Sequence, residues 1–185
     1  MYESVAKRTP PRTVSRPELL ANGSDRDFRA LVHGLLAFSA RLEAVRSGFG
    51  GLLGLTGIQY TILISVGHLE PAGDVGVNHI AAHLHISGAF VTIETGKLLK
   101  LGLLAKRPHT RDRRRVCLSI TEKGSALLQQ LAPIQAQVND VLFEFLDTAQ
   151  FRQFRELVGR MTECGDRAVT LLQHLAGRAT AIKVS

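Results

Sequence analysis

LGLLAKRPHTRDRRRVCLSITEKG, residues 101–124, is the stretch of sequence that decides the fold. Two apolar runs, 103–105 and 116–120, flank a polar insert. In the second run Val116, Leu118 and Ile120 alternate with smaller residues, a period of two that predicts a strand with one buried face. The ten residues from 106 to 115 contain six Lys or Arg and a single acid. The stretch therefore predicts a β-hairpin whose basic tip meets a polyanion.

Composition narrows the class of protein. The chain has 185 residues, a formal net charge of +7 and a sequence pI of about 10.0, which favours nucleic acid or another anionic surface over an acidic partner. No apolar run approaches the roughly 18 residues that a membrane span needs, and the first residues lack the apolar segment of a signal peptide. Two cysteines, Cys117 and Cys164, give no disulfide framework. We expect a cytoplasmic protein with no membrane partner.

The residues before the hairpin predict a series of helices. Ser24 is expected to cap the first, whose apolar residues recur at three- and four-residue steps from Phe28 to Phe49, and the glycines between 48 and 54 are expected to end it. The run Thr56-Gly57-Ile58-Gln59 predicts a capping box that opens a second helix, closed by Pro71.

A pair of short helices follows. One is expected around 79–84 and the next from about Gly88 to Lys100, with Ser87 as its cap and a turn of about three residues between them. Such a pair predicts a helix-turn-helix, whose second helix lies in the major groove of DNA. Followed directly by a basic hairpin, it predicts a winged helix, with the hairpin reaching the phosphates and the neighbouring minor groove.

The chain here resembles the MarR family of bacterial transcriptional regulators. The motifs that carry the resemblance are Leu98-x-x-x-Gly102-Leu103, Arg107, Asp112-Arg113-Arg114 and Leu118-x-x-Thr121-Glu122-Lys123-Gly124. The resemblance implies an obligate homodimer whose first and last helices interlock, pseudo-palindromic operators, a repressor role and release by small, often aromatic ligands. It also implies that Asp112 braces the hairpin and that Arg114 enters the minor groove, with Arg113 as a second contact.

The predicted DNA contacts lie on the second helix of the pair and on the hairpin tip. They are Ser87, Ala89, Thr92, Ile93, Lys97, Arg111, Asp112, Arg113 and Arg114. The outward face of the helix is small and nearly uncharged, so it offers hydroxyl and thymine-methyl contacts but no bidentate Arg–guanine pair. Relatives often have Arg at the position of Ile93 and an apolar residue at that of Glu94. Either Glu94 is a partly buried acid with a basic partner, or the helix is rotated.

Two long helices are predicted after the hairpin, with apolar stripes from Leu127 to Phe145 and from Phe151 to Leu175. A small lobe cannot cover these stripes and that of the first helix, which predicts a subunit interface. The predicted fold is mainly α with one small β-hairpin. Its predicted parts are a flexible basic tail (1–23), a helical dimerisation region (24–55 and 122–176), a winged helix-turn-helix lobe (56–121) and a C-terminal tail (177–185).

Other chemistry finds less support in the sequence. His79 and His83 share one helical face with His85 close behind, a spacing that can hold a metal, but surface histidines near DNA are the preferred interpretation and no metal site is predicted. Redox sensing by Cys117 or Cys164 is a weaker alternative. The sequence shows no catalytic constellation, so we expect neither an enzyme nor a cofactor.

The predicted winged helix points to a DNA-binding protein, and the resemblance implies a ligand-responsive transcriptional regulator, a repressor that binds its operator as a homodimer. Its effector is expected to be an aromatic acid or the thioester of one, and Arg46, Phe49 and Tyr60 are the candidate ligand-binding residues. The alternative is a sequence-tolerant architectural DNA-binding protein, which the plain recognition face would suit.

Overall fold

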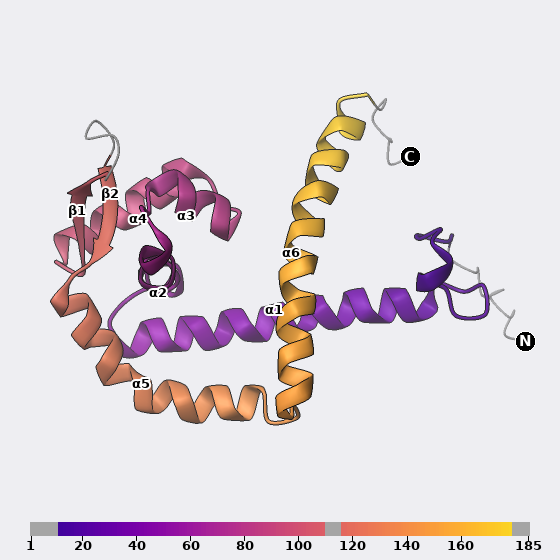
Figure 1. Ribbon diagram of the computed structural model, residues 1–185, viewed down its shortest axis with the longest axis horizontal. Helices are drawn as coiled ribbons and strands as arrows, with labels where there is room; N and C mark the ends of the chain where they lie inside the picture. The colour runs from indigo at the N-terminus through magenta and orange to yellow at the C-terminus, as the bar shows by residue number, and fades with distance from the viewer. Residues whose placement is uncertain (1–10, 110–115, 179–185) are drawn as a thin grey trace, which may run out of the picture. The chain divides into compact units, whose positions relative to one another are not determined.

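The computed structural model describes residues 11–109 and 116–178 of the chain. The chain divides into two compact units, Met1–Gln135 and Ala136–Ser185, which are described separately. The elements, labelled in Figure 1, are η1 (Pro17–Leu19), α1 (Arg26–Leu52), α2 (Gly57–Leu69), η2 (Glu70–Ala72), α3 (Val77–Leu84), α4 (Gly88–Lys100), β1 (Leu104–Pro108), β2 (Val116–Ile120), α5 (Glu122–Leu142) and α6 (Thr148–Ala176). The predicted class, mainly α with a small hairpin, is confirmed.

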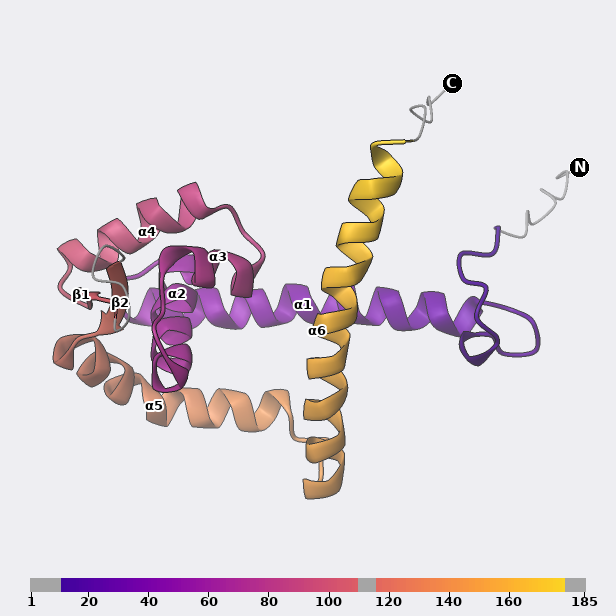
Figure 2. The same cartoon turned by 45° about the horizontal axis from the view of Figure 1, so that its top comes forward.

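The first unit is built around a winged helix-turn-helix. Its core is one cluster of buried apolar side chains contributed by α2, α3, α4, both strands and the segments just before α2, α3 and β1: Leu55, Ile62, Leu63, Val66, Val75, Ile80, Val91, Leu98, Leu103, Leu104 and Leu118. The strands β1 and β2 pair antiparallel, with Leu104 opposite Ile120 and Pro108 opposite Val116. Figures 1 and 2 both show this hairpin beside the end of α4 that leads into β1.

The turn from α1 into α2 depends on glycines. The expectation that Gly48, Gly50 and Gly51 end the first helix is wrong, because α1 continues through them to Leu52. A Cβ atom on Gly50 would lie 2.9 Å from the carbonyl oxygen of Thr56, so this glycine allows the start of α2 to approach closely. Gly54, with φ +69°, makes the turn itself. The capping box predicted at the start of α2 is confirmed: Thr56 Oγ1 accepts from the Gln59 N–H at 3.3 Å.

The predicted alternation of buried and exposed residues along β2 is wrong. Val116 is 54% exposed, whereas Cys117 and Leu118 are both buried. The cause is a third segment: the Leu118 N–H donates to the Val75 carbonyl at 2.7 Å, an isolated bridge that brings the chain before α3 alongside the strand. Leu101, directly after α4, is also exposed, and the chain turns after it at Gly102, which has φ +70°.

At the N-terminal end of the described chain, Thr13 contacts the start of α1. Its backbone N–H and hydroxyl donate to Asp25 Oδ2 at 2.7 and 2.9 Å, and Asp25 pairs with Arg29. Asp25, rather than the predicted Ser24, precedes the first turn. The predicted division into tails, dimerisation region and lobe stays a prediction.

The second unit contains the long helix α6. Asp147 caps it with a capping box, in which Asp147 Oδ1 accepts from the Gln150 N–H at 2.8 Å. Across 148–176, all of them described, no side chain is buried, although the helix carries a full apolar stripe. Among the described residues no single helix is long and apolar enough to span a membrane. Only when α1 and Gly57–Ala72, which are bent relative to each other, are taken together do length and composition reach that requirement.

Candidate nucleic-acid interface

The turn between α3 and α4 sets the angle at which α4 is presented. His85, the C-cap of α3, adopts a left-handed conformation with φ 53°, and its N–H reaches the carbonyls at the end of α3. Ser87 then caps α4 as predicted, its hydroxyl accepting from the Phe90 N–H at 3.2 Å. The two helices therefore meet through a short, hydrogen-bonded turn, the arrangement that places the second helix of such a pair in a DNA groove.

The outer face of α4 is available to a ligand. All five side chains predicted there are exposed: Ser87, Ala89, Thr92, Ile93 and Lys97. The Thr92 hydroxyl donates to the Gly88 carbonyl at 2.8 Å, which leaves its oxygen to accept from a base amino group. Ile93 is 58% exposed and matches a thymine methyl in character. The sequence prediction missed Phe90, which is 42% exposed and lies three residues before Ile93, a spacing that places both on one helical face.

Glu94 is a buried acid with partners. This agrees with the first of the two interpretations, an acid paired with a basic residue, and not with a rotated helix. Its Oε1 accepts from Lys97 Nζ at 2.7 Å and its Oε2 from Gln59 Nε2 at 2.9 Å. The hydrogen bond from Lys97 is the main cause that holds the pKa of Glu94 below its ordinary value, and that from Gln59 adds to it. Glu94 therefore balances part of the charge of Lys97, so this lysine is not available to DNA phosphates alone.

The base of the hairpin is joined to the helices by acids. Arg107 on β1 forms an ion pair with Asp74 and lies 3.8 Å from Glu70, and its pKa is raised chiefly by the bond to Asp74. The Ile120 N–H on β2 donates to Glu70 Oε2 at 3.1 Å. Arg107 therefore orients the hairpin, because its charge is compensated by these two acids.

The Thr121-Glu122-Lys123-Gly124 motif connects the hairpin to α5. The Thr121 hydroxyl donates to the Gly102 carbonyl at 2.7 Å and accepts from the Gly124 N–H at 3.0 Å. Lys123 Nζ donates to the Leu101 carbonyl at 2.7 Å. Any side chain on Gly124 would overlap the Leu103 carbonyl oxygen. The motif is therefore a structural clamp between the end of α4 and the start of α5.

A family model described as the MarR family matches residues 53–115, which include α2, the helix-turn-helix and β1. Over these residues the chain is similar to the MarR family. The matched part contains the pair α3 and α4 and the first strand of the hairpin, which correspond to the helix-turn-helix and the start of the wing in that family.

Two relatives that match part of this chain are named as HTH-type transcriptional regulators. The HTH-type transcriptional regulator YhbI of Bacillus subtilis (strain 168) is 29% identical over 112 residues, 60% of this chain and 71% of the relative. The HTH-type transcriptional repressor MdtR of the same organism is 23% identical over 113 residues, 61% of this chain and 71% of its own.

Two solved structures establish the fold. A MarR/EmrR family transcriptional regulator from Acinetobacter sp. ADP1 has a TM-score of 0.63 at 18% identity and covers 75% of this chain and 96% of its own. A mutant MarR from E. coli complexed with operator DNA has a TM-score of 0.58 at 17% identity and covers 73% of this chain and 95% of its own.

The predicted contacts at the wing tip, Arg111, Asp112, Arg113 and Arg114, lie outside the described residues, and their roles stay predictions. The predicted effector residues lie together where α1 meets α2. The rings of Phe49 and Tyr60 stack edge to face with centroids 5.8 Å apart, and both are buried. Burial raises the pKa of Tyr60, whose hydroxyl accepts from Gln135 Nε2 at 2.6 Å, while Arg46 pairs with Glu43.

Proposed function

We propose that this protein is a MarR-family regulator, a repressor that binds a pseudo-palindromic operator as a homodimer and is released by a small effector. One observation carries the proposal: a helix with an exposed, nearly uncharged face, α4, directly precedes a hairpin that ion pairs fix to the same lobe. The α4 residues Ser87, Ala89, Thr92, Ile93 and Lys97 would read the major groove. The wing residues Arg111, Arg113 and Arg114 would meet phosphates and the minor groove, with Asp112 bracing them.

The apolar surfaces of both units support a homodimer. On α1 Leu31 and Leu36 are 57% and 61% exposed, and on α6 Leu171 and Leu172 are 58% and 66% exposed. Stripes of this size on long helices mark an interaction surface. A two-fold axis would also present two copies of α4 to successive major grooves, about 34 Å apart. This supports the assignment of 24–55 and 122–176 to a dimerisation region around the lobe 56–121.

The repressor role is supported by the relative MdtR, whose name describes a repressor. A repressor needs a release signal, and Arg46, Phe49 and Tyr60 offer a cation and two aromatic rings at the α1–α2 junction. An aromatic acid or its thioester is the chemistry that such a set would bind. By linkage, an effector that weakens DNA binding must itself bind more weakly to the DNA complex.

The test is a gel-shift titration at physiological salt of the full chain against its own upstream region and against random DNA of equal length. We expect a specificity ratio of about 10³ or more for an operator-binding regulator. A ratio below about tenfold would favour the second candidate, a sequence-tolerant DNA-binding protein. The observation that favours this second candidate is that no Arg lies on the described outer face of α4.

Release is tested by repeating the titration with a panel of aromatic acids and acyl thioesters. The proposal expects at least one compound to weaken operator binding by fivefold or more, the usual lower range of allosteric coupling. A Tyr60→Phe variant should respond less while binding DNA equally well. Operator affinity unchanged by the whole panel would contradict this class of effector.

A further inference from the structure

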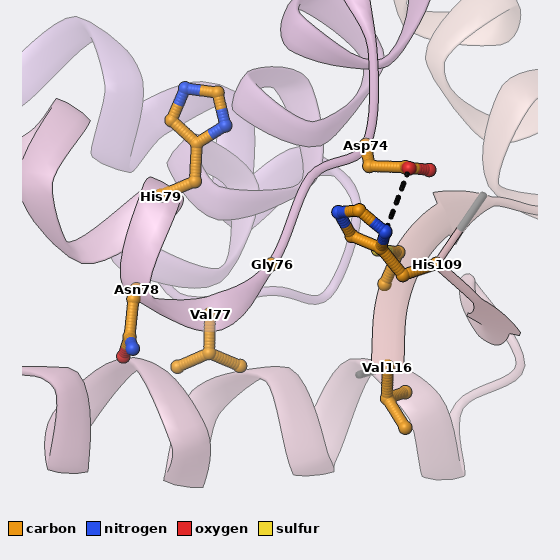
Figure 3. A pocket seen from close by; sticks show the side chains of 8 residues that line it. Asp74, Gly76, Val77, Asn78, His79, His109 and Val116 are labelled. Atoms are coloured by element: carbon orange, nitrogen blue, oxygen red, sulfur yellow. Dashed lines mark ion pairs between the residues drawn. The ribbon is translucent and has the colours of Figure 1, made fainter. Parts of the chain in front are cut away.

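The base of the wing gathers three metal-binding side chains from distant parts of the sequence. Asp74 precedes α3, His109 directly follows β1, and Cys117 lies on β2. One ligand atom from each, a carboxylate oxygen, an imidazole nitrogen and the sulfur, lie within 4.8 Å of one another. All three line a cavity of about 420 Å³, shown in Figure 3.

We propose that Asp74, His109 and Cys117 form a binding site for a divalent transition metal of the zinc class. A thiolate, an imidazole and a carboxylate are the donors that Zn²⁺ and Co²⁺ prefer, whereas Mg²⁺ and Ca²⁺ select oxygen ligands only. One thiolate and one carboxylate also balance the charge of a divalent ion. The thiol proton of Cys117 would leave to solvent as the metal binds.

The geometry of the three side chains suits an inserted ion. Asp74 Oδ2 and His109 Nδ1 face one another at 3.5 Å, as the dashed line in Figure 3 marks. This separation exceeds the usual hydrogen-bond range and is close to the edge of a tetrahedron of ligands about 2.1 Å from a metal, roughly 3.4 Å. A modest movement of Cys117 would bring its sulfur into the same sphere.

The surroundings prepare the ligands in two ways. Arg107 pairs with Oδ1 of Asp74, which orients Oδ2 toward His109, and ligating carboxylates are commonly held by such an outer partner. The site is also sheltered, since the side chains of Asp74 and His109 are 9% and 17% exposed and Cys117 is 1% exposed. Figure 3 shows His79, which also lines the cavity, apart from the Asp74–His109 pair, so water would supply the fourth ligand.

A metal here would tie both strands of the wing to the segment before α3. Without the metal, the contacts that make this connection include the Leu118–Val75 hydrogen bond, the ion pairs of Arg107 and the Asp74–His109 pair. Adding coordination bonds would raise the thermal stability of the lobe. It would also restrict the directions in which the wing projects. These effects concern the lobe alone, so the site does not depend on the proposed repressor role.

The experiment uses the full-length chain without an affinity tag, freed of metal by a chelator and titrated with Co²⁺. A thiolate ligand produces a charge-transfer band in the near ultraviolet, so the spectrum reports coordination by cysteine. We expect one equivalent of Co²⁺ to give this band in the parent and in Cys164→Ser, and Cys117→Ser to lack it. Zn²⁺ should remove the band and Mg²⁺ should not. Zn²⁺ should raise Tm in the parent.

His109→Gln against His83→Gln is the second matched pair, and it keeps both cysteines. His83 lines a different cavity with His68, so its loss should leave the Co²⁺ affinity unchanged. Loss of His109 should weaken that affinity by about tenfold or more. No charge-transfer band in the parent, a band that survives in Cys117→Ser, or equal Co²⁺ affinities for the parent and His109→Gln would each overturn the proposal.

Discussion

The side-chain amide of Gln59 connects α2 to α4: its Nε2 donates to Oε2 of Glu94 at 2.9 Å, and its Oε1 accepts from the Thr56 N–H at 3.1 Å. One residue therefore closes the capping box of α2 and holds the buried carboxylate behind the outer face of α4. Lys97 supplies the second partner of that carboxylate. The position of the recognition helix thus depends on a polar contact inside the lobe as well as on apolar packing.

Replacing Gln59 by Ala should reduce the free energy of unfolding by roughly 2–4 kcal/mol. About 1 kcal/mol of this is the helix cap, and the rest is the cost of leaving a buried carboxylate short of a donor. The matched control is Gln150→Ala, which removes the equivalent capping-box residue at the exposed start of α6 and should cost about 1 kcal/mol or less. Urea unfolding measures both, and equal losses would show that the Glu94 contact contributes nothing.

The lowered pKa of Glu94 makes stability depend on pH at the acid end. The folded pKa lies below the ordinary value of 4.5, so the carboxylate stabilises the fold fully above that value, and this contribution is lost as pH falls through the folded pKa. We expect Glu94→Gln to be less stable than the parent near pH 6 and to lose less stability between pH 5 and pH 3. Urea titrations at these pH values check this. Parallel losses in parent and variant would contradict it.

Local patterns were enough to predict most of the fold. The capping box at Thr56, the cap at Ser87 and the hairpin strand at 116–120 depend on residues a few positions apart, and the structure confirms all three. The glycines of α1 were misinterpreted because a glycine that ends a helix and one that permits close packing look the same in sequence. Gly50 belongs to the second kind.

Contacts between distant residues could not be predicted in this way. The sequence indicated that Glu94 needs a partner, but Gln59 lies 35 residues away and no local pattern connects them. The grouping of Asp74 with His109 and Cys117 depends likewise on the bridge between Val75 and Leu118. Attention to i,i+4 spacing selected His79 and His83 instead, because spacing along one helix is visible in a sequence and pairing across a sheet is not.

Gly124 is predicted to tolerate no side chain. A Cβ atom there would overlap the Leu103 carbonyl, a backbone atom that cannot move without disturbing the hairpin. Gly124→Ala should therefore destabilise the protein by about 2 kcal/mol or more. Gly159→Ala is the matched control, since nothing lies within 4 Å of its added methyl and Ala favours a helix by roughly 1 kcal/mol. Thermal unfolding of both variants decides: a Gly124→Ala protein as stable as the parent would refute the clamp.

Helix and wing should contribute differently to DNA binding. Arg114→Ala should weaken binding to operator and random DNA alike and should reduce the salt slope, d log K/d log[salt], by about 0.9, the value for one lost phosphate contact. Ile93→Ala should weaken operator binding by roughly fivefold, leaving random DNA and the salt slope unchanged, because its loss removes an apolar contact to a base. Gel shifts at three salt concentrations separate the two. If both variants lost affinity in the same pattern, the division of roles between α4 and the wing would be wrong.

The apolar stripe of α6 provides the sharpest test of the homodimer. Leu172 is 66% exposed in the single chain, and covering such a side chain at an interface stabilises by roughly 1.5–3 kcal/mol. Because a two-fold axis repeats every substitution, Leu172→Glu would place two charges in the interface at once. We expect sedimentation to show a dimer for the parent and a monomer for this variant. Gln173→Glu adds the same charge at the next exposed position and should remain dimeric. If the Leu172→Glu protein were still a dimer, this part of α6 would not belong to the interface. If the parent itself were a monomer, the proposal that a two-fold dimer binds the operator would be wrong.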